Sequence, residues 1–317
     1  MRISVYCLLY YMRINAHCQG AVKYFLHVQD RCDILDEIFC HGSGDKNIFG
    51  KERKMSKRIE IVSSFYNEVN EDERLNRNRC GQLEYATTME YIHRYAKPGA
   101  KLLEIGAGTG RYSIALAKEG YEVSAIELVE QNFEVLKRNG SSLPNLQAFQ
   151  GDALDLTLFA DECFDVTLVF GPMYHLYEQK DVHKALDEAL RVTKKDGVVL
   201  VAFLSVYAIL YNNYLQGNLM DGLEENFTEE YAIRHFEEQL FTGYDVTEFE
   251  ELFAEKPVEK LAVVGVDSVL ELAQERSDFV MSDAEFEAFA KYHLNFCEKR
   301  ELLGGSSHLL YICRKEN

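Results

Sequence analysis

Three glycines at alternate positions follow an apolar run and could form a binding turn. Residues 102–105 are followed by Gly106, Gly108 and Gly110. Glycine reaches positive φ angles and has no Cβ atom, so such a turn can bring backbone N–H groups close to a ligand. An apolar run, a glycine-rich turn and an amphipathic segment are typical of a strand, a turn and a helix. This stretch therefore predicts a site for a nucleotide-like ligand.

The spacing of the glycines distinguishes between ligands. A dinucleotide fingerprint, G-x-G-x-x-G, that begins at Gly106 needs its third glycine at position 111, which is Arg111. The third glycine is Gly110 instead. The spacing therefore disfavours a nicotinamide-dependent oxidoreductase.

Two acidic residues follow the next two expected strands. Glu127 ends the second strand, where an ionised carboxylate can accept hydrogen bonds from both hydroxyls of a ribose. The alternative is an acid at a helix N-terminus, which the helix dipole favours. Asp152 follows the third strand and could accept the amine of an adenine, with Ala153 leaving room for the ring, or could form an Asx turn. Together with the glycines, these positions favour an adenosine-containing ligand.

The elements that must position these residues alternate between strand and helix. Such alternation is typical of a parallel sheet covered on both faces, in which ligands bind beyond the carboxyl ends of the strands. Residues 205–256 interrupt the alternation, and we expect this insertion and a helix near 57–69 to close over the site. The expected strands are 102–105, 122–128, 145–150, 164–170, 198–204, 260–266 and 308–313. The expected helices include 82–95, 112–118, 130–138, 181–193, 269–274 and 284–300.

Several of these segments resemble the motifs of small-molecule class I S-adenosylmethionine-dependent methyltransferases, in the usual order. They are the E-x-G-x-G-x-G pattern of residues 104–110, Glu127, residues 151–153, the strand 164–170 and the run 189–197. The resemblance implies a Rossmann-like, doubly wound sheet of seven strands whose last strand is antiparallel. It also implies S-adenosylmethionine (SAM) as the cofactor. The cofactor-binding residues that it implies are Glu104, Gly106, Ala107, Gly108, Gly110, Glu127, Leu128, Asp152, Ala153 and Phe170.

A narrower resemblance concerns the segment after the fourth strand. Residues 171–176 (GPMYHL) and 302–310 resemble a bacterial branch of this family whose substrates are mostly unassigned. The first segment lies where the methyl acceptor is expected. It differs from the D/N-P-P-Y motif of enzymes that methylate amines of nucleic acids, because Gly171 replaces the residue that accepts the amine hydrogens and Met173 replaces the second proline. A nucleic-acid acceptor is therefore disfavoured.

One histidine and three tyrosines are candidates for the acceptor side. His175 is the candidate general base because imidazole titrates near neutral pH. The alternative is a histidine that caps the following turn or packs under the sheet edge. Tyr66, Tyr174 and Tyr211 are candidates for the walls of an acceptor pocket, since aromatic faces stabilise cations such as a sulfonium. The alternative for each tyrosine is a place in the core.

Composition excludes several classes of protein. The 317 residues carry a formal net charge of −18, which disfavours DNA and RNA as partners because their binding relies on Lys and Arg contacts. No apolar run is long enough for a transmembrane helix and no signal peptide is visible, so we expect a cytoplasmic protein without membrane contacts. The eight cysteines contain no C-x-x-C pair, and we expect no metal site.

Residues 1–54 differ from the rest of the chain. They contain four of the eight cysteines and are slightly basic, with eight basic and six acidic side chains. Residues 50–54 could all be encoded by purine-only codons, as in a ribosome-binding site read in frame. We therefore expect a working methyltransferase domain of residues 55–317 that begins at Met55. The alternative is a genuine N-terminal extension that covers the active site or a partner surface.

These observations lead to one preferred function and its alternatives. The preferred function is transfer of a methyl group from SAM to a small-molecule acceptor. A non-catalytic protein that binds the cofactor and acts through a partner is the main alternative, and a nucleic-acid methyltransferase is less favoured. Neither the acceptor nor the oligomeric state follows from the sequence.

Overall fold

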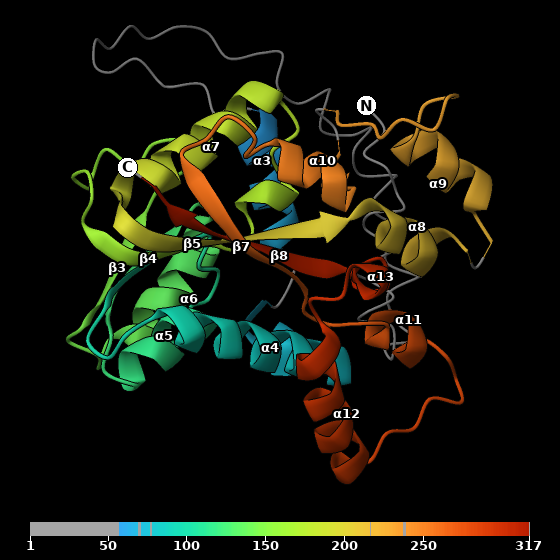
Figure 1. Ribbon diagram of the computed structural model, residues 1–317, viewed down its shortest axis with the longest axis horizontal. Helices are drawn as coiled ribbons and strands as arrows, with labels where there is room; N and C mark the ends of the chain where they lie inside the picture. Colours follow the sequence, from blue (N-terminus) through green and yellow to red (C-terminus); the bar gives the residue numbers. More distant parts are fainter. Residues whose placement is uncertain (1–56, 69–70, 77, 216, 237–238, 317) are drawn as a thin grey trace, which may run out of the picture. The chain divides into compact units, whose positions relative to one another are not determined.

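A mainly parallel β-sheet is the centre of the chain that the structure describes (Figure 1). This computed structural model describes residues 57–68, 71–76, 78–215, 217–236 and 239–316. The expected start of the domain at Met55 lies outside these residues. No helix of the described chain combines the length and apolar character that a membrane span needs.

Seven strands form a continuous path, in the order β3-β2-β1-β4-β5-β8-β7, and β6 pairs with β5 beside it. Neighbours from β3 to β5 are parallel, whereas β8 is antiparallel to both β5 and β7. The expected Rossmann-like sheet with its last strand antiparallel is therefore confirmed. The strands are β1 (Lys101–Ile105), β2 (Glu122–Glu127), β3 (Leu146–Gln150), β4 (Phe164–Val169), β5 (Thr193–Ser205), β6 (Gly243–Tyr244), β7 (Val258–Gly265) and β8 (His308–Lys315).

Helices cover both faces of the sheet, as Figure 1 shows. Helices α7 and α10 bury apolar side chains against one face, and α4 and α5 bury theirs against the other. The α-helices are α3 (Lys57–Tyr66), α4 (Arg79–Tyr95), α5 (Arg111–Lys118), α6 (Glu130–Gly140), α7 (Gln179–Val192), α8 (Val206–Tyr214), α9 (Leu219–Asn226), α10 (Val246–Glu251), α11 (Leu270–Gln274), α12 (Asp283–Phe296) and α13 (Arg300–Leu303). Two 3-10 helices, η1 (Glu71–Asn76) and η2 (Pro172–Tyr174), lie between them.

The order of the strands reverses between β1 and β4. From β1 the chain proceeds outward through β2 and β3, and then returns to pair β4 with the other side of β1. The segments that follow β1 and β4 therefore meet at the carboxyl edge, where Phe170 N–H donates to the Ile105 carbonyl at 2.9 Å. Ligands of open α/β sheets bind at such a switch point.

Helix α4 and strand β5 begin well before the positions that the sequence predicts. Helix α4 begins at Arg79 because the Asn78 side chain accepts a hydrogen bond from Gly81 N–H at 2.9 Å and caps the helix. Strand β5 begins at Thr193, within a segment expected to end α7, because Phe164 of β4 pairs with Thr193 before the register shifts. Both differences arise from contacts that helical and strand periodicity do not reveal.

The expected insertion 205–256 contains α8, α9, β6 and α10. Its last part belongs to the core, however. Tyr244 and Phe249 are fully buried, and the Phe249 ring stacks on Phe203 of β5 with 3.9 Å between the ring centroids. The part of the insertion that contains β6 and α10 is therefore anchored in the core.

Candidate active site

The glycine turn connects β1 to α5. Gly106, Gly108 and Gly110 have φ angles of 81°, 54° and 91°. The N–H groups of Gly106 and Ala107 both donate to the Ile126 carbonyl at 2.9 Å, which holds the turn against β2. These φ angles are unfavourable for residues that have a Cβ atom, so the three glycines allow the backbone to adopt this turn.

Gly106 also allows a close contact between the two chain segments at the switch point. A Cβ atom on Gly106 would lie 2.3 Å from the Phe170 carbonyl oxygen and 2.7 Å from Pro172 Cδ. A Cβ atom on Gly110 would lie 2.3 Å from Leu136 Cδ1 of α6. The glycines therefore serve the packing of the turn as well as its φ angles.

Glu127 ends β2 beside the turn and is buried. Its Oε2 accepts a hydrogen bond from Gly108 N–H at 2.7 Å, and its Oε1 accepts one from Val129 N–H at 2.9 Å, just before α6. Glu127 thus holds the turn and the start of α6 together.

Glu104 lies beneath the turn rather than at its surface. Its Oε2 accepts hydrogen bonds from the backbone N–H of Ser113, at 2.9 Å, and from the Ser113 hydroxyl. Burial raises the pKa of Glu104 to about 7; the Ser113 bonds oppose this rise and the nearby Glu127 adds to it. The side chain of Glu104 therefore connects β1 to α5 and positions the turn.

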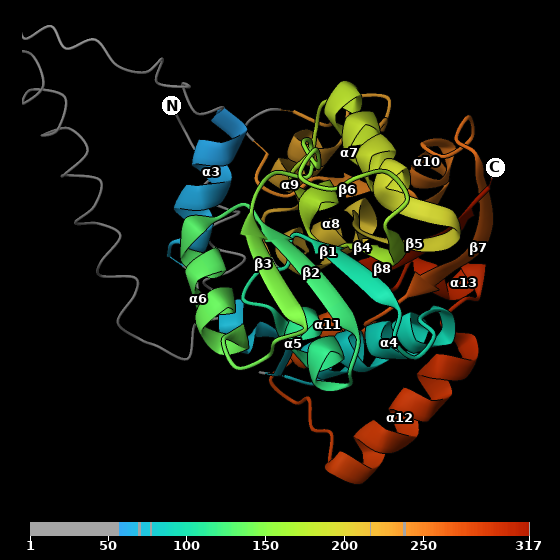
Figure 2. The same cartoon turned by 90° about the vertical axis from the view of Figure 1, so that its left-hand side faces the viewer.

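Asp152 makes an ion pair that the sequence did not reveal. Its partner is Arg58 of α3, a helix that lies beside α6 (Figure 2). Asp152 Oδ1 also accepts a hydrogen bond from Leu154 N–H at 3.1 Å. This bond forms the Asx turn that was the alternative prediction for Asp152. The structure thus brings α3 to the strand end at which an adenine was expected.

The other predicted cofactor residues surround the same edge. Ala107 and Ala153 are buried, and Ala107 packs with Ala125 and Leu136, so only the backbone of Ala107 could face a ligand. Phe170 is buried, with its ring centroid 5.2 Å from that of Tyr112. Leu128 is half-buried.

His175 follows η2 and is buried. Its Nδ1 lies 2.6 Å from the Leu240 carbonyl, and because a carbonyl only accepts, Nδ1 carries the proton. The lone pair on Nε2 then accepts from the Tyr66 hydroxyl at 3.2 Å. Burial lowers the pKa of His175 to about 4; the Leu240 bond opposes this and Arg58 adds to it. His175 is therefore neutral near pH 7, with its basic atom directed at Tyr66.

The three candidate tyrosines fall in different places. Tyr66 of α3 and Tyr174 of η2 both lie beside His175, with ring centroids 5.6 Å and 6.3 Å from it. Tyr211 lies on α8 and is 41% exposed. The structure therefore gathers Tyr66 and Tyr174 around the candidate base and leaves Tyr211 at the surface of the insertion.

A cluster of charged side chains near Tyr174 was missed by sequence reasoning. Arg74 donates two hydrogen bonds to the buried Glu84, at 2.8 Å and 3.0 Å. His308 Nδ1 lies 2.7 Å from Asp267 Oδ2 and 3.9 Å from Glu84 Oε2. Only His308 lay within a segment that the resemblance had singled out, residues 302–310. The others come from distant segments with no shared spacing.

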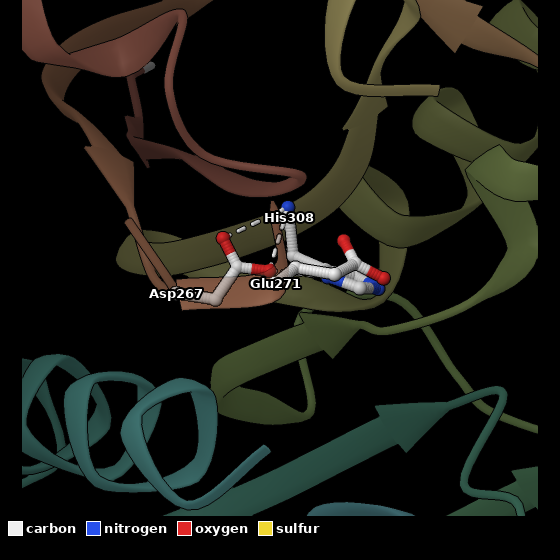
Figure 3. Close-up of side chains that lie close together, drawn as sticks. All are labelled: Asp267, Glu271 and His308. Carbon is white, nitrogen blue, oxygen red and sulfur yellow. Dashed lines mark hydrogen bonds and ion pairs between the residues drawn. The ribbon is translucent and has the colours of Figure 1, made fainter. Parts of the chain in front are cut away.

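Asp267, Glu271 and His308 gather at the start of β8 (Figure 3). They are side-chain types that bind metals, and one candidate ligand atom of each lies within 4.8 Å of the others. However, His308 Nδ1–H donates to Asp267, so the nitrogen that faces this carboxylate carries a proton. The geometry is that of a hydrogen-bonded charge pair.

The central part of the chain matches a known protein family. Residues 103–201 match a family model described as a methyltransferase domain, which is about a third of the chain. This segment contains the glycine turn, Glu127, Asp152 and His175. SAM is the cofactor that this domain implies.

Curated relatives match over a similar region. A demethylmenaquinone methyltransferase of Renibacterium salmoninarum is 37% identical over 126 residues, covering 38% of this chain and 50% of the relative. The protein of that name from Staphylococcus aureus is 35% identical over 128 residues, covering 36% of this chain and 51% of the relative. The chain thus spans about half the length of the curated relatives it matches.

Solved structures share the fold over a larger part of the chain. A SAM-dependent methyltransferase of Thermotoga maritima has a TM-score of 0.51 and 18% identity, covering 82% of this chain and all of that one (100%). A Pyrococcus horikoshii protein has a TM-score of 0.51 and 16% identity, covering 80% of this chain and 99% of that one. At these identities the likeness concerns the fold alone.

Proposed function

We propose that this chain, whose residues 103–201 are a methyltransferase domain, transfers a methyl group from SAM to a small-molecule acceptor. The observation that carries the proposal is the hydrogen bond from Gly108 N–H to Glu127, which joins the turn after β1 to a buried carboxylate at the end of β2. Asp152 adds a second carboxylate at the end of β3, the next strand along the sheet edge.

The residues at this edge suit the parts of SAM. The turn at Gly106 and Gly108 leaves backbone without side chains, which fits the amino-acid portion. The Glu127 carboxylate is a hydrogen-bond acceptor of the kind that ribose hydroxyls need. Asp152 is an acceptor for the adenine amine, which shares this carboxylate with Arg58. SAM supplies an electrophilic methyl group on its sulfonium. The protein must hold the acceptor in line with it, which by itself provides much of the rate.

Support for a small acceptor comes from three sources. Gly171 stands where amine-methylating enzymes of nucleic acids have a hydrogen-bond acceptor. The net charge of −18 opposes binding of a phosphate backbone. The curated relatives are named for demethylmenaquinone, which is a small molecule. In this proposal His175 removes a proton from the acceptor, directly or through the Tyr66 hydroxyl that it faces.

Methyl turnover tests the proposal against the non-catalytic alternative. The full chain is incubated with SAM labelled in its methyl group and with small molecules, beginning with reduced demethylmenaquinone analogues and simple phenols. We expect label to appear in one class of acceptor. Tight binding of SAM without turnover on any extracted metabolite pool would favour the non-catalytic binder.

Replacing Glu127 with alanine should weaken SAM binding by about 1–3 kcal/mol, which is about 5- to 150-fold in Kd. The ribose hydroxyls lose their acceptor, and Gly108 N–H loses the bond that orders the turn. Isothermal calorimetry measures the effect. Glu122→Ala, at the opposite and exposed end of β2, is the control and should bind normally. Equal affinity in the two variants would remove Glu127 from the cofactor site.

We also propose that α8 and α9 form a lid that closes over the reacting groups, because water must be excluded from an activated methyl donor. Hydrogen exchange of the amides in α8 and α9 should slow when cofactor and acceptor bind. The amides of α10, which packs Phe249 into the core, are an internal reference that should be protected in both states. Unchanged exchange in α8 and α9 would contradict a lid.

A further inference from the structure

His308 is the first residue of β8, but it lies at the edge where the parallel strands have their carboxyl ends. Strand β8 is antiparallel to β5, so its first residue pairs with Leu204 near the end of β5. The His308 ring centroid lies 6.0 Å from that of Tyr174, which follows β4. His308 therefore lies on the same side of the sheet as the segment where the acceptor is expected.

A hydrogen-bond network holds one ring nitrogen of His308, Nδ1. Its Nδ1–H donates to Asp267 Oδ2 at 2.7 Å, while Asp267 Oδ1 accepts from the Ser306 hydroxyl at 2.6 Å and from Ser307 N–H at 2.9 Å. This network fixes the orientation of the ring. Among the residues that the structure describes, Nε2 of His308 has no hydrogen-bond partner, and the side chain is 14% exposed.

The surroundings keep this imidazole charged. Burial disfavours the charged form, but the carboxylates of Glu84 and Asp267 outweigh burial and raise the pKa of His308 to about 9. Near pH 7, His308 therefore has two N–H donors and a positive charge, and it cannot act as a base. The titratable groups around this cluster come from the segment after β7, α4, α11, η1 and η2. They include Asp267, Glu84, Cys80, Glu271, Arg74 and Tyr174.

The cluster also adjoins the cofactor side of the site. Tyr112 follows the glycine turn, stacks on Tyr85 and contacts Phe170 at the end of β4. Burial and the nearby Glu84 raise the pKa of Tyr112, and Arg74 opposes this rise. Tyr112 therefore lies near both the charged cluster and the start of α5.

We propose that His308 is an acceptor-binding residue whose Nε2–H donates a hydrogen bond to an acceptor oxygen that becomes anionic, such as the oxygen of a phenol or an enol. This inference rests on the proposed methyltransferase function and deepens it by naming the class of acceptor. A charged donor at this place stabilises an oxyanion and disfavours a cationic amine. Asp267 acts as the positioning residue that orients the ring.

A binding experiment tests this without turnover. The full chain is saturated with S-adenosylhomocysteine, the demethylated cofactor, and titrated with 2-hydroxy-1,4-naphthoquinone, an aromatic enol that is anionic at neutral pH. We expect His308→Gln to bind this probe about 10- to 100-fold more weakly than the wild type, since a charged hydrogen bond is lost. His93→Gln, which alters an exposed histidine that also pairs with a carboxylate, is the matched control and should bind like the wild type.

The wild type alone provides a second measurement. Below its pKa of about 9 the imidazolium donates from Nε2, and above it the neutral ring presents a lone pair there, so probe affinity should fall as pH rises through about 9. His308→Gln should lack this fall. If the variant misfolds, the pH profile of the wild type still decides the question.

Each outcome has a distinct meaning. Failure of the wild type to bind S-adenosylhomocysteine contradicts the proposed function itself. Normal S-adenosylhomocysteine binding with no probe binding, with equal affinity in His308→Gln, or with no change near pH 9 overturns the role of His308. Probe affinity that disappears on addition of a chelator would also overturn it, in favour of a metal held by this cluster.

Discussion

Replacement of Gly106 with alanine is expected to abolish measurable cofactor binding and to lower the free energy of unfolding by about 2–5 kcal/mol. The φ angle of 81° costs a residue with a Cβ atom about 1–2 kcal/mol. The added Cβ would lie 2.3 Å from the Phe170 carbonyl, and relieving such a contact typically costs about 1–3 kcal/mol more. Relief requires the segments after β1 and β4 to move apart at the switch point, which distorts the binding edge.

Gly120→Ala is the matched control for this prediction. Gly120 has a φ angle of 97°, but a Cβ atom there would meet no atom within 4 Å. This variant should therefore lose only about 1–2 kcal/mol and keep normal cofactor binding. Chemical denaturation gives the stabilities and calorimetry gives the affinities. If the two variants behave alike, the close approach at Gly106 has no role in shaping the site.

His175→Gln should reduce methyl turnover by about 10²-fold or more while cofactor affinity stays near that of the wild type. The reason is that the Leu240 carbonyl fixes the proton on Nδ1 and leaves Nε2 as the basic atom. General-base catalysis by a positioned side chain typically contributes at least this factor. Steady-state kinetics with an acceptor found by the turnover experiment measures the loss.

The pH profile adds a second criterion for His175. Because its pKa is lowered to about 4, activity that depends on the neutral imidazole should be lost only as pH falls through about 4, rather than through the ordinary value near 6.5. Tyr66→Phe keeps the ring beside His175 and removes the hydroxyl, so it shows whether the proton passes through Tyr66. A His175→Gln variant that retains most of its turnover would leave His175 with a structural role.

Local signals in the sequence were sufficient to predict the parallel sheet and the glycine turn. The alternation of strand and helix predicts a parallel sheet, and the glycine spacing predicts a turn that the structure shows with three positive φ angles. The sequence also predicts that Glu127 lies at the end of a strand, and it is the last residue of β2. These features depend on neighbours within a few residues, or on the rule that parallel strands end at one edge, so a linear pattern can reveal them.

Other assignments needed the tertiary structure. The ligand contacts of Glu104 and Ala107 stay predictions. The structure shows that Glu104 bonds to Ser113 and that the Ala107 side chain packs in the core. Whether a side chain at a strand end faces a ligand or a helix depends on how that helix packs. That packing is decided by contacts between elements, which periodicity does not encode.

The acceptor side depended on the tertiary structure most of all. Arg58 meets Asp152 and Tyr66 meets His175 across separations of 94 and 109 residues, and Asp267 meets His308 across 41. The antiparallel direction of β8 places His308 at the same edge as Tyr174. The sequence by itself thus determined the fold and the edge at which the strand order reverses, because these follow from local conformation and strand order. Only the folded chain decided which groups meet around His175 and His308, because burial and long-range pairing set both their geometry and their pKa values.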